Sequence, residues 1–357
     1  MPNGLALAEV HRAAGGVIEE VCGWQLPRHY GDPAREYRAV REGAGLIDRS
    51  MLGKVVVTGR DRLAFLQGML TNDVGSLQPG QGTAAAFLDA HGKVHALLSV
   101  YALEDRVWLE LPASLTEKTL QTLDRYLISE KAYFESADDA FVVLALQGPG
   151  AVDLLAGVCG RSPELAPYAH AEVTIAGTPV RVIHRREAGL PGVHCWTAAG
   201  HGGALWEALL KAGAQPVGVD TLNVLRVEAG VAWYGHDVDE SVILPEAQLE
   251  HLVSYTKGCY IGQEVVARVK YRGHINRGLV GLVLEGDRVP GFNARVAADG
   301  KEVGRITSAV RSPAVGKPIA LGYVRREHFE PGSAVTVEDG DRPLQARVSA
   351  LPFIPAA

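Results

Sequence analysis

The feature that most constrains the fold is a change in the sequence pattern near Ile275. After this residue, short strand-like runs alternate with Gly, Pro, Asp and Asn turns. The runs cover residues 278–284, 294–297, 302–308, 320–324, 334–337 and 344–350. Many short strands at such spacing are typical of a small barrel or sandwich. We therefore predict a C-terminal antiparallel β-barrel domain in residues 276–357.

Residues 1–275 have a mixed pattern. A strand-like run at 53–59 is followed by a helical face at 60–70, and a second run at 141–148 reaches a glycine and then a helical stretch at 151–158. The two units suggest related halves around one core, although ordinary α+β repetition is an open alternative. A three-stranded meander is expected between them, at residues 83–88, 93–102 and 106–111.

Composition narrows the class of protein. With 357 residues, 47% of them hydrophobic, the chain can bury a sizeable core. A net charge of −6 argues against a general nucleic-acid binder, so we expect no direct nucleic-acid partner. No apolar run is long enough for a secretory signal or a membrane span, which predicts a cytoplasmic protein without a membrane partner. The four cysteines form no C-x-x-C pair, so no metal site is expected.

The densest local chemistry lies in residues 257–264, Lys-Gly-Cys-Tyr-Ile-Gly-Gln-Glu. If a helix begins near Gly262, Cys259 lies just ahead of its N-terminus, where unpaired N–H groups favour a thiolate. Lys257 adds positive charge, and such surroundings lower the pKa of a thiol. The alternative is that Cys259 is a small buried hydrophobe, as free cysteines commonly are.

This motif resembles the signature of the YgfZ family. These are folate-binding proteins of iron–sulfur enzyme maintenance, which in turn resemble the glycine-cleavage T-protein, an aminomethyltransferase. Further segments resemble that superfamily, at residues 65–74, 225–230, 234–237, 322–324 and 352–355. The resemblance implies an α+β fold of three lobes in a ring, with a central folate site and a C-terminal antiparallel β-barrel.

Two departures from the T-protein pattern affect the expected chemistry. Ala96 and Leu97 stand where the T-protein carries paired aspartates, one of which assists aminomethyl transfer. A hydrocarbon side chain cannot take part in proton transfer. His194 matches the T-protein glutamate that holds the pterin edge, and a neutral imidazole offers one acceptor where a carboxylate offers two. The resemblance therefore predicts an altered or lost pterin contact.

The resemblance also implies roles for other residues. Arg226 matches the arginine associated with folate, and its rigid fork of donors suits an anionic or carbonyl group. The alternative is a salt bridge between Arg226 and Glu228 or a neighbouring acid. The expected folate-binding residues are Arg226, Glu228, His194, Gln263 and Glu264. Cys259 and Lys257 are the expected catalytic residues.

We therefore predict a tetrahydrofolate-binding protein that supports the assembly or repair of iron–sulfur enzymes, including radical enzymes that modify tRNA. Its partners would be folate and iron–sulfur client proteins. One alternative is a tetrahydrofolate-dependent aminomethyltransferase, and another is a non-enzymatic folate-sensing scaffold. If the chain is an enzyme, we expect a tetrahydrofolate-dependent one-carbon, aminomethyl-type transferase.

Overall fold

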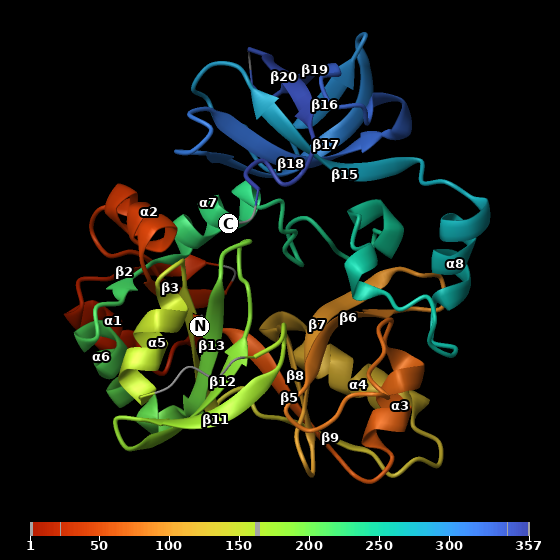
Figure 1. Cartoon of the computed structure of the whole chain (residues 1–357). Coiled ribbons are helices and arrows are strands. Elements are labelled where there is room, and N and C mark those ends of the chain that lie inside the picture. Colours follow the sequence, from red (N-terminus) through yellow and green to blue (C-terminus); the bar gives the residue numbers. More distant parts are fainter. Residues whose placement is uncertain (1–2, 22, 161–164, 341, 356–357) are drawn as a thin grey trace. The chain divides into compact units, whose positions relative to one another are not determined.

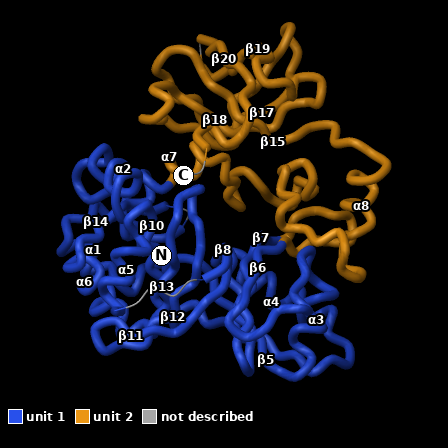
Figure 2. Tube along the Cα trace, viewed as in Figure 1, with its two compact units in different colours: residues 1–85, 96–222, 357 blue, residues 86–95, 223–356 orange. Residues whose placement is uncertain are grey.

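The computed structural model describes residues 3–21, 23–160, 165–340 and 342–355 (Figure 1). The chain divides into two compact units (Figure 2). Unit 1 comprises residues 1–85, 96–222 and 357, and unit 2 comprises residues 86–95 and 223–356. Among the described residues, no helix is long and apolar enough to cross a membrane.

Unit 1 contains sheets of three and six strands, and most of a five-stranded sheet whose strands β6 and β7 extend into unit 2. The three-stranded sheet has the order β1 (Asn3–Gly4), β3 (Trp24–His29), β2 (Val17–Val21). The six-stranded sheet has the order β11 (His170–Ile175), β12 (Thr178–His184), β13 (Gly192–Ala198), β10 (Phe141–Gln147), β4 (Gly45–Asp48), β14 (Gln215–Pro216). The five-stranded sheet has the order β6 (Gly82–Leu88), β7 (Val94–Ala102), β8 (Val107–Pro112), β5 (Leu52–Thr58), β9 (Tyr133–Ser136).

Local chemistry accounts for the start of one helix of unit 1. In α2 (Pro33–Glu42), Asp32 is the N-cap and accepts a hydrogen bond from the Ala34 N–H, while Pro33 occupies the first turn, where its missing N–H costs nothing. The other helices of unit 1 are α1 (Ala8–Ala13), α3 (Arg62–Met69), α4 (Thr116–Tyr126), α5 (Ala151–Cys159) and α6 (Gly202–Lys211). Helix α7 (Val219–Glu228) spans the unit boundary, and α8 (Gln263–Arg272) belongs to unit 2.

The C-terminal strands of unit 2 form a closed six-stranded antiparallel barrel. Around the barrel the order is β15 (Arg277–Leu284), β18 (Pro318–Arg325), β17 (Lys301–Arg311), β16 (Arg295–Ala298), β19 (Ala334–Glu338), β20 (Leu344–Ser349). Small apolar residues such as Val296, Ile306 and Val337 fill its core. Gly304 is required because a Cβ there would lie 1.9 Å from the Tyr323 carbonyl oxygen.

The predicted fold class, α+β with a C-terminal antiparallel barrel, is confirmed. The six expected strand runs correspond to β15–β20, and the expected meander corresponds to β6, β7 and β8. The domain boundary near Ile275 and the relation between the two α+β halves stay predictions.

Candidate functional site

A chain of five charged side chains is enclosed in unit 1, around His194. The chain runs Arg185, Glu110, His194, Glu187, Arg49, so that basic and acidic groups alternate. Glu110 comes from β8 of the five-stranded sheet and His194 from β13 of the six-stranded sheet. The chain therefore joins two sheets of unit 1 through charged groups.

His194 is the centre of this chain. Its side chain is fully buried, with Nδ1 3.4 Å from Glu110 Oε2 and Nε2 3.3 Å from Glu187 Oε2. The second oxygen of each carboxylate faces an arginine. Arg185 Nη1 lies 2.7 Å from Glu110 Oε1, and Arg49 Nη2 lies 2.8 Å from Glu187 Oε1.

A hydrogen-bonded frame fixes the residues around His194. The side chain of Gln147 accepts a hydrogen bond from the Glu187 N–H and donates one to the Arg185 carbonyl. Arg185 Nη1 also donates to Tyr101 Oη at 3.0 Å and to the Ser99 hydroxyl. Because these partners lie in strands β7 and β10 or in the connection between β12 and β13, they restrict the positions of the charged groups.

The electrostatics favour the charged forms of this chain. Burial alone would lower the pKa of His194, but the hydrogen bonds and negative charges of Glu110 and Glu187 raise it above its ordinary value. Burial alone would raise the pKa of Glu187, but the charge of Arg49 and the hydrogen bond from His194 lower it to about 2. The pKa of Glu110 is also lowered, against the effect of burial, by Arg185 and His194.

Ala96 and Leu97, which stand where the T-protein pattern has aspartates, lie on β7. Ala96 is fully buried and Leu97 is half-buried. The turn before this strand is built around Asp89, whose carboxylate accepts hydrogen bonds from the His91 and Lys93 N–H groups. The carboxylate of Asp89 thus stabilises the hairpin, and residues 96 and 97 offer no proton-transfer group.

Arg226 lies inside unit 2, with 2% of its residue surface exposed. Its Nη1 donates to Asp237, its Nη2 donates to Ser308 Oγ at 2.6 Å, and its Nε donates to Asn223 Oδ1 at 2.8 Å. Trp233 covers the guanidinium, 4.8 Å from its ring centre. The salt-bridge alternative is therefore realised with Asp237, and a folate group at Arg226 would have to replace one of these partners.

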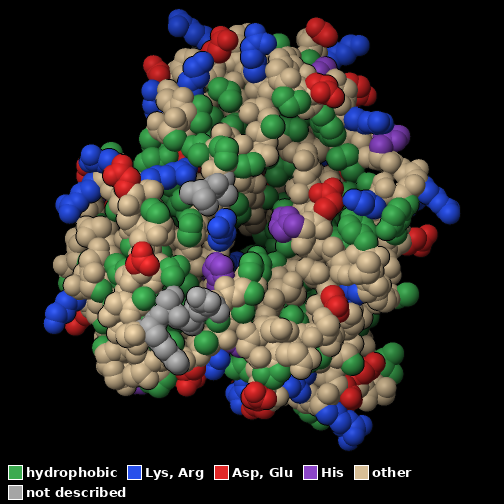
Figure 3. All heavy atoms as spheres, viewed as in Figure 1, with side chains coloured by type: hydrophobic (Ala, Val, Ile, Leu, Met, Phe, Trp, Pro, Cys, Tyr) green, Lys and Arg blue, Asp and Glu red, His purple; other side chains and the backbone are tan. Residues whose placement is uncertain are grey.

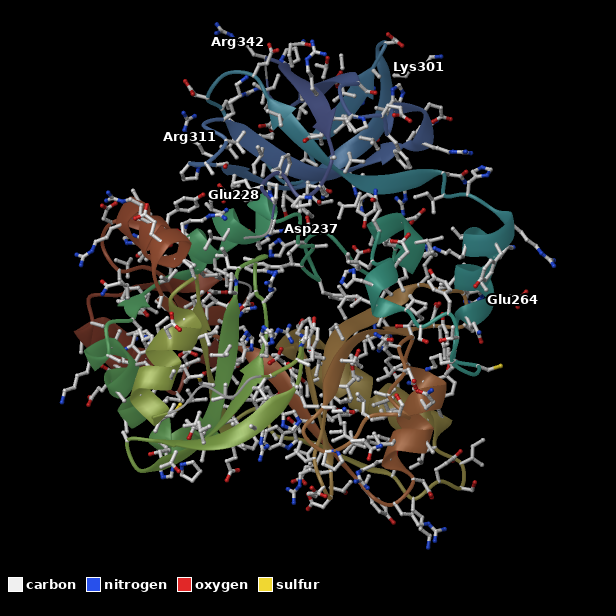
Figure 4. The ribbon with its side chains drawn as sticks, viewed as in Figure 1. Glu228, Asp237, Glu264, Lys301, Arg311 and Arg342 are labelled. Atoms are coloured by element: carbon white, nitrogen blue, oxygen red, sulfur yellow. The ribbon has the colours of Figure 1, made fainter. Side chains whose placement is uncertain are left out.

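The other expected folate-binding residues lie apart from one another along unit 2. Glu228 is buried, and its carboxylate accepts a hydrogen bond from the Ser312 hydroxyl. Gln263 is the half-buried first residue of α8, whereas Glu264 is exposed and points away from the helix (Figure 4). The folate-binding roles of these residues and of His194 stay predictions.

Cys259 carries an exposed thiol ahead of α8. The helix begins at Gln263, in agreement with the start predicted near Gly262. Gly262 is its N-cap and has a left-handed backbone conformation (φ 81°). A Cβ on Gly262 would lie 2.5 Å from the Asp89 carbonyl oxygen, so the motif packs on the β6–β7 turn within unit 2. The ammonium of Lys257 lies 5.1 Å from the ring centre of Tyr260. The catalytic roles of Cys259 and Lys257 stay predictions.

Four members of the buried group around His194 were not among the residues expected from the sequence, namely Arg49, Glu110, Arg185 and Glu187. Glu110 lies in a strand that is otherwise apolar, whereas Arg49, Arg185 and Glu187 lie just after strands β4 and β12. The available signal was the single acid of Val107–Pro112 and the single histidine of Gly192–Ala198, because a lone titratable group in an apolar strand needs a partner.

The comparisons with known proteins agree with this architecture. The GCVT N-terminal domain model matches residues 7–257, and the glycine cleavage T-protein C-terminal barrel domain model matches residues 277–354. An aminomethyltransferase of Streptomyces coelicolor is 32% identical over 98% of this chain and 96% of its own length. One from Rubrobacter xylanophilus is 34% identical over 97% of this chain and 93% of its own length.

A solved structure is similar over the whole chain. The glycine cleavage system aminomethyltransferase T from Bartonella henselae has a TM-score of 0.92 and 26% identity, covering 100% of this chain and 99% of that one. The chain belongs to the glycine-cleavage T-protein family.

Proposed function

We propose that this protein is a tetrahydrofolate-dependent aminomethyltransferase of the T-protein type. The observation that carries the proposal is the nearly full-length similarity to curated aminomethyltransferases, together with the TM-score of 0.92 to a solved one. Aminomethyltransferases of this family use tetrahydrofolate, which is the folate that we assign to this chain. The similarity favours this function over the YgfZ-type function that the motif at 257–264 suggests.

The chemistry of the proposed reaction differs here from the family pattern at one step. Ala96 and Leu97 supply no acid or base, so proton transfer during aminomethyl transfer falls to another group, such as solvent. We therefore expect slow turnover. Replacing Ala96 by Asp would restore a carboxylate on β7 and is expected to raise the rate.

The test is a reconstituted glycine-cleavage assay. The chain is combined with the other components of the system, and formation of methylenetetrahydrofolate is measured, with calorimetric tetrahydrofolate binding measured on the same preparation. Turnover above that of the components alone supports the proposal. Tetrahydrofolate binding without any turnover, in the wild type and in Ala96→Asp, contradicts it.

A second candidate function rests on Cys259. The exposed thiol in the 257–264 motif favours a folate-binding protein of the YgfZ type that maintains iron–sulfur enzymes as its clients. In cells that depend on this chain for iron–sulfur enzyme activity, Cys259→Ser is expected to abolish that support while Cys159→Ser leaves it. Equal support by both variants contradicts the role of the thiol.

A further inference from the structure

The buried chain around His194 carries one more positive than negative charge. A carboxylate oxygen only accepts hydrogen bonds, and both ring nitrogens of His194 face carboxylate oxygens at 3.3–3.4 Å. Both nitrogens can donate only if the ring is an imidazolium. Arg49, Arg185 and His194 then oppose Glu110 and Glu187, which leaves an excess of one positive charge within this group of five residues.

Of the five charged side chains, Arg185 is the one that reaches solvent. Its side chain is 22% exposed, while those of Glu110, His194, Glu187 and Arg49 are at most 8% exposed. Within the described part of the protein, Nη1 makes the hydrogen bonds of Arg185 to Ser99 and Tyr101 and its ion pair with Glu110. The Tyr168 ring lies over the guanidinium, with its centre 5.8 Å from Cζ. Nε and Nη2, which form the other edge of the planar guanidinium, have no side-chain or backbone acceptor among the described residues.

We propose that this outer edge of Arg185 binds the carboxylate of a small-molecule ligand. A ligand carboxylate would continue the alternation of basic and acidic groups beyond Arg185, and its negative charge would balance the excess positive charge of the five residues. The guanidinium edge presents two N–H groups side by side, which match the two oxygens of a carboxylate. Since Glu110, Ser99 and Tyr101 hold the opposite edge, little side-chain entropy remains to be lost on binding.

The charge balance links this site to a proton on His194. The groups that face the imidazole are Glu110 on β8 and Glu187 in the connection after β12, with Arg185 and Arg49 behind them. Loss of the imidazolium proton would remove the excess positive charge and with it part of the attraction for an anion. Carboxylate binding should therefore weaken as the pH rises through the pKa of His194, which the two carboxylates raise.

Acetate is the first probe, with chloride at equal ionic strength as the reference. NMR follows the Nε–H signal of Arg185 and the ring nitrogens of His194 in the full-length chain. A saturable acetate-dependent shift is expected in the wild type. It is expected in Arg181→Gln as well, because Arg181 is a similarly exposed arginine (19%) on β12 that pairs with Glu172. Arg185→Lys keeps the charge but loses the fork, so its affinity, followed through His194, should fall about tenfold or more.

A second pair of probes identifies the source of the carboxylate. Tetrahydrofolate carries glutamate carboxylates, whereas tetrahydropterin carries no carboxylate and is the reference for binding through the pterin ring alone. Both are measured as binding, so neither result depends on turnover. If Arg185→Lys weakens tetrahydrofolate binding alone, the site takes folate carboxylates; if it weakens acetate binding alone, the site takes free small carboxylates. The proposal is overturned if Arg185→Lys, folded by circular dichroism, binds both carboxylate probes as the wild type does, or if the wild type binds neither.

Discussion

Replacement of Asp237 by alanine should strongly destabilise unit 2. The Asp237 carboxylate is fully buried and accepts hydrogen bonds from the Trp233 N–H, Thr307 Oγ1 and Ser308 Oγ at 3.0, 2.6 and 2.7 Å, as well as from Arg226. Removing it leaves the buried guanidinium of Arg226 without its counter-charge. Breaking a buried ion pair on one side costs about 3–5 kcal/mol of unfolding free energy.

The matched control is an exposed pair in the same unit. Asp287 pairs with Arg311 at 2.7 Å, and their side chains are 87% and 53% exposed. Asp287→Ala should cost less than about 1 kcal/mol, because water screens this pair. Urea denaturation followed by tryptophan fluorescence measures both variants, and Trp233 reports on the Arg226 site directly because it covers the guanidinium.

The double variant Arg226→Met/Asp237→Leu tests the reasoning further. Replacing both partners by apolar residues removes the unpaired charge, so it should recover part of the stability that Asp237→Ala loses. If Asp237→Ala costs no more than Asp287→Ala, the buried pair does not hold unit 2 together, and the interior role assigned to Arg226 is refuted.

Three further outcomes are expected. The pKa of Glu187 is lowered to about 2 in the folded protein. Its stabilising contribution is therefore complete above the pKa of the unfolded chain, about 4.5, and is lost as the pH falls from there towards 2. When the free energy of unfolding is measured at decreasing pH, Glu187→Gln should lose less stability than the wild type. The pKa of His194 is raised, so its contribution is complete below about 6.5 and is lost as the pH rises through the folded pKa, a dependence that His194→Gln should remove. Gly262→Ala should lower the melting temperature measurably, because φ is 81° and the new Cβ would meet Asp89, whereas Gly258→Ala, with no atom within 4 Å, should not.

The barrel could be predicted from the sequence because its signals are local. Its strands pair through short connections, for example β16 with β17 and β19 with β20, and turn residues mark the ends of each run. The start of α8 was equally local, since Gly262 is needed both for its left-handed backbone and for the close approach to Asp89. Strands and helix starts of this kind can be recognised from a few consecutive residues of the sequence.

The charged chain around His194 could not be predicted in this way. Glu110 and His194 are 84 positions apart, and each lies in a strand whose neighbours are apolar. Only the pairing of β10 with β13 and of β5 with β8, within two separate sheets, brings these strands to their places. The sequence could show that each residue needed a partner, but not that they are partners of each other.

The surroundings of His194 change the meaning of its difference from the T-protein pattern. Read alone, a histidine in place of a glutamate indicates a lost carboxylate. In the structure, Glu110 and Glu187 place two carboxylates against the imidazole, and two arginines balance them. Burying four charged groups and most of a fifth is costly, and apolar residues of similar size would fill the same volume at lower cost. The retained charge and its solvent-facing end at Arg185 therefore support a ligand-binding role for this place over a purely structural one.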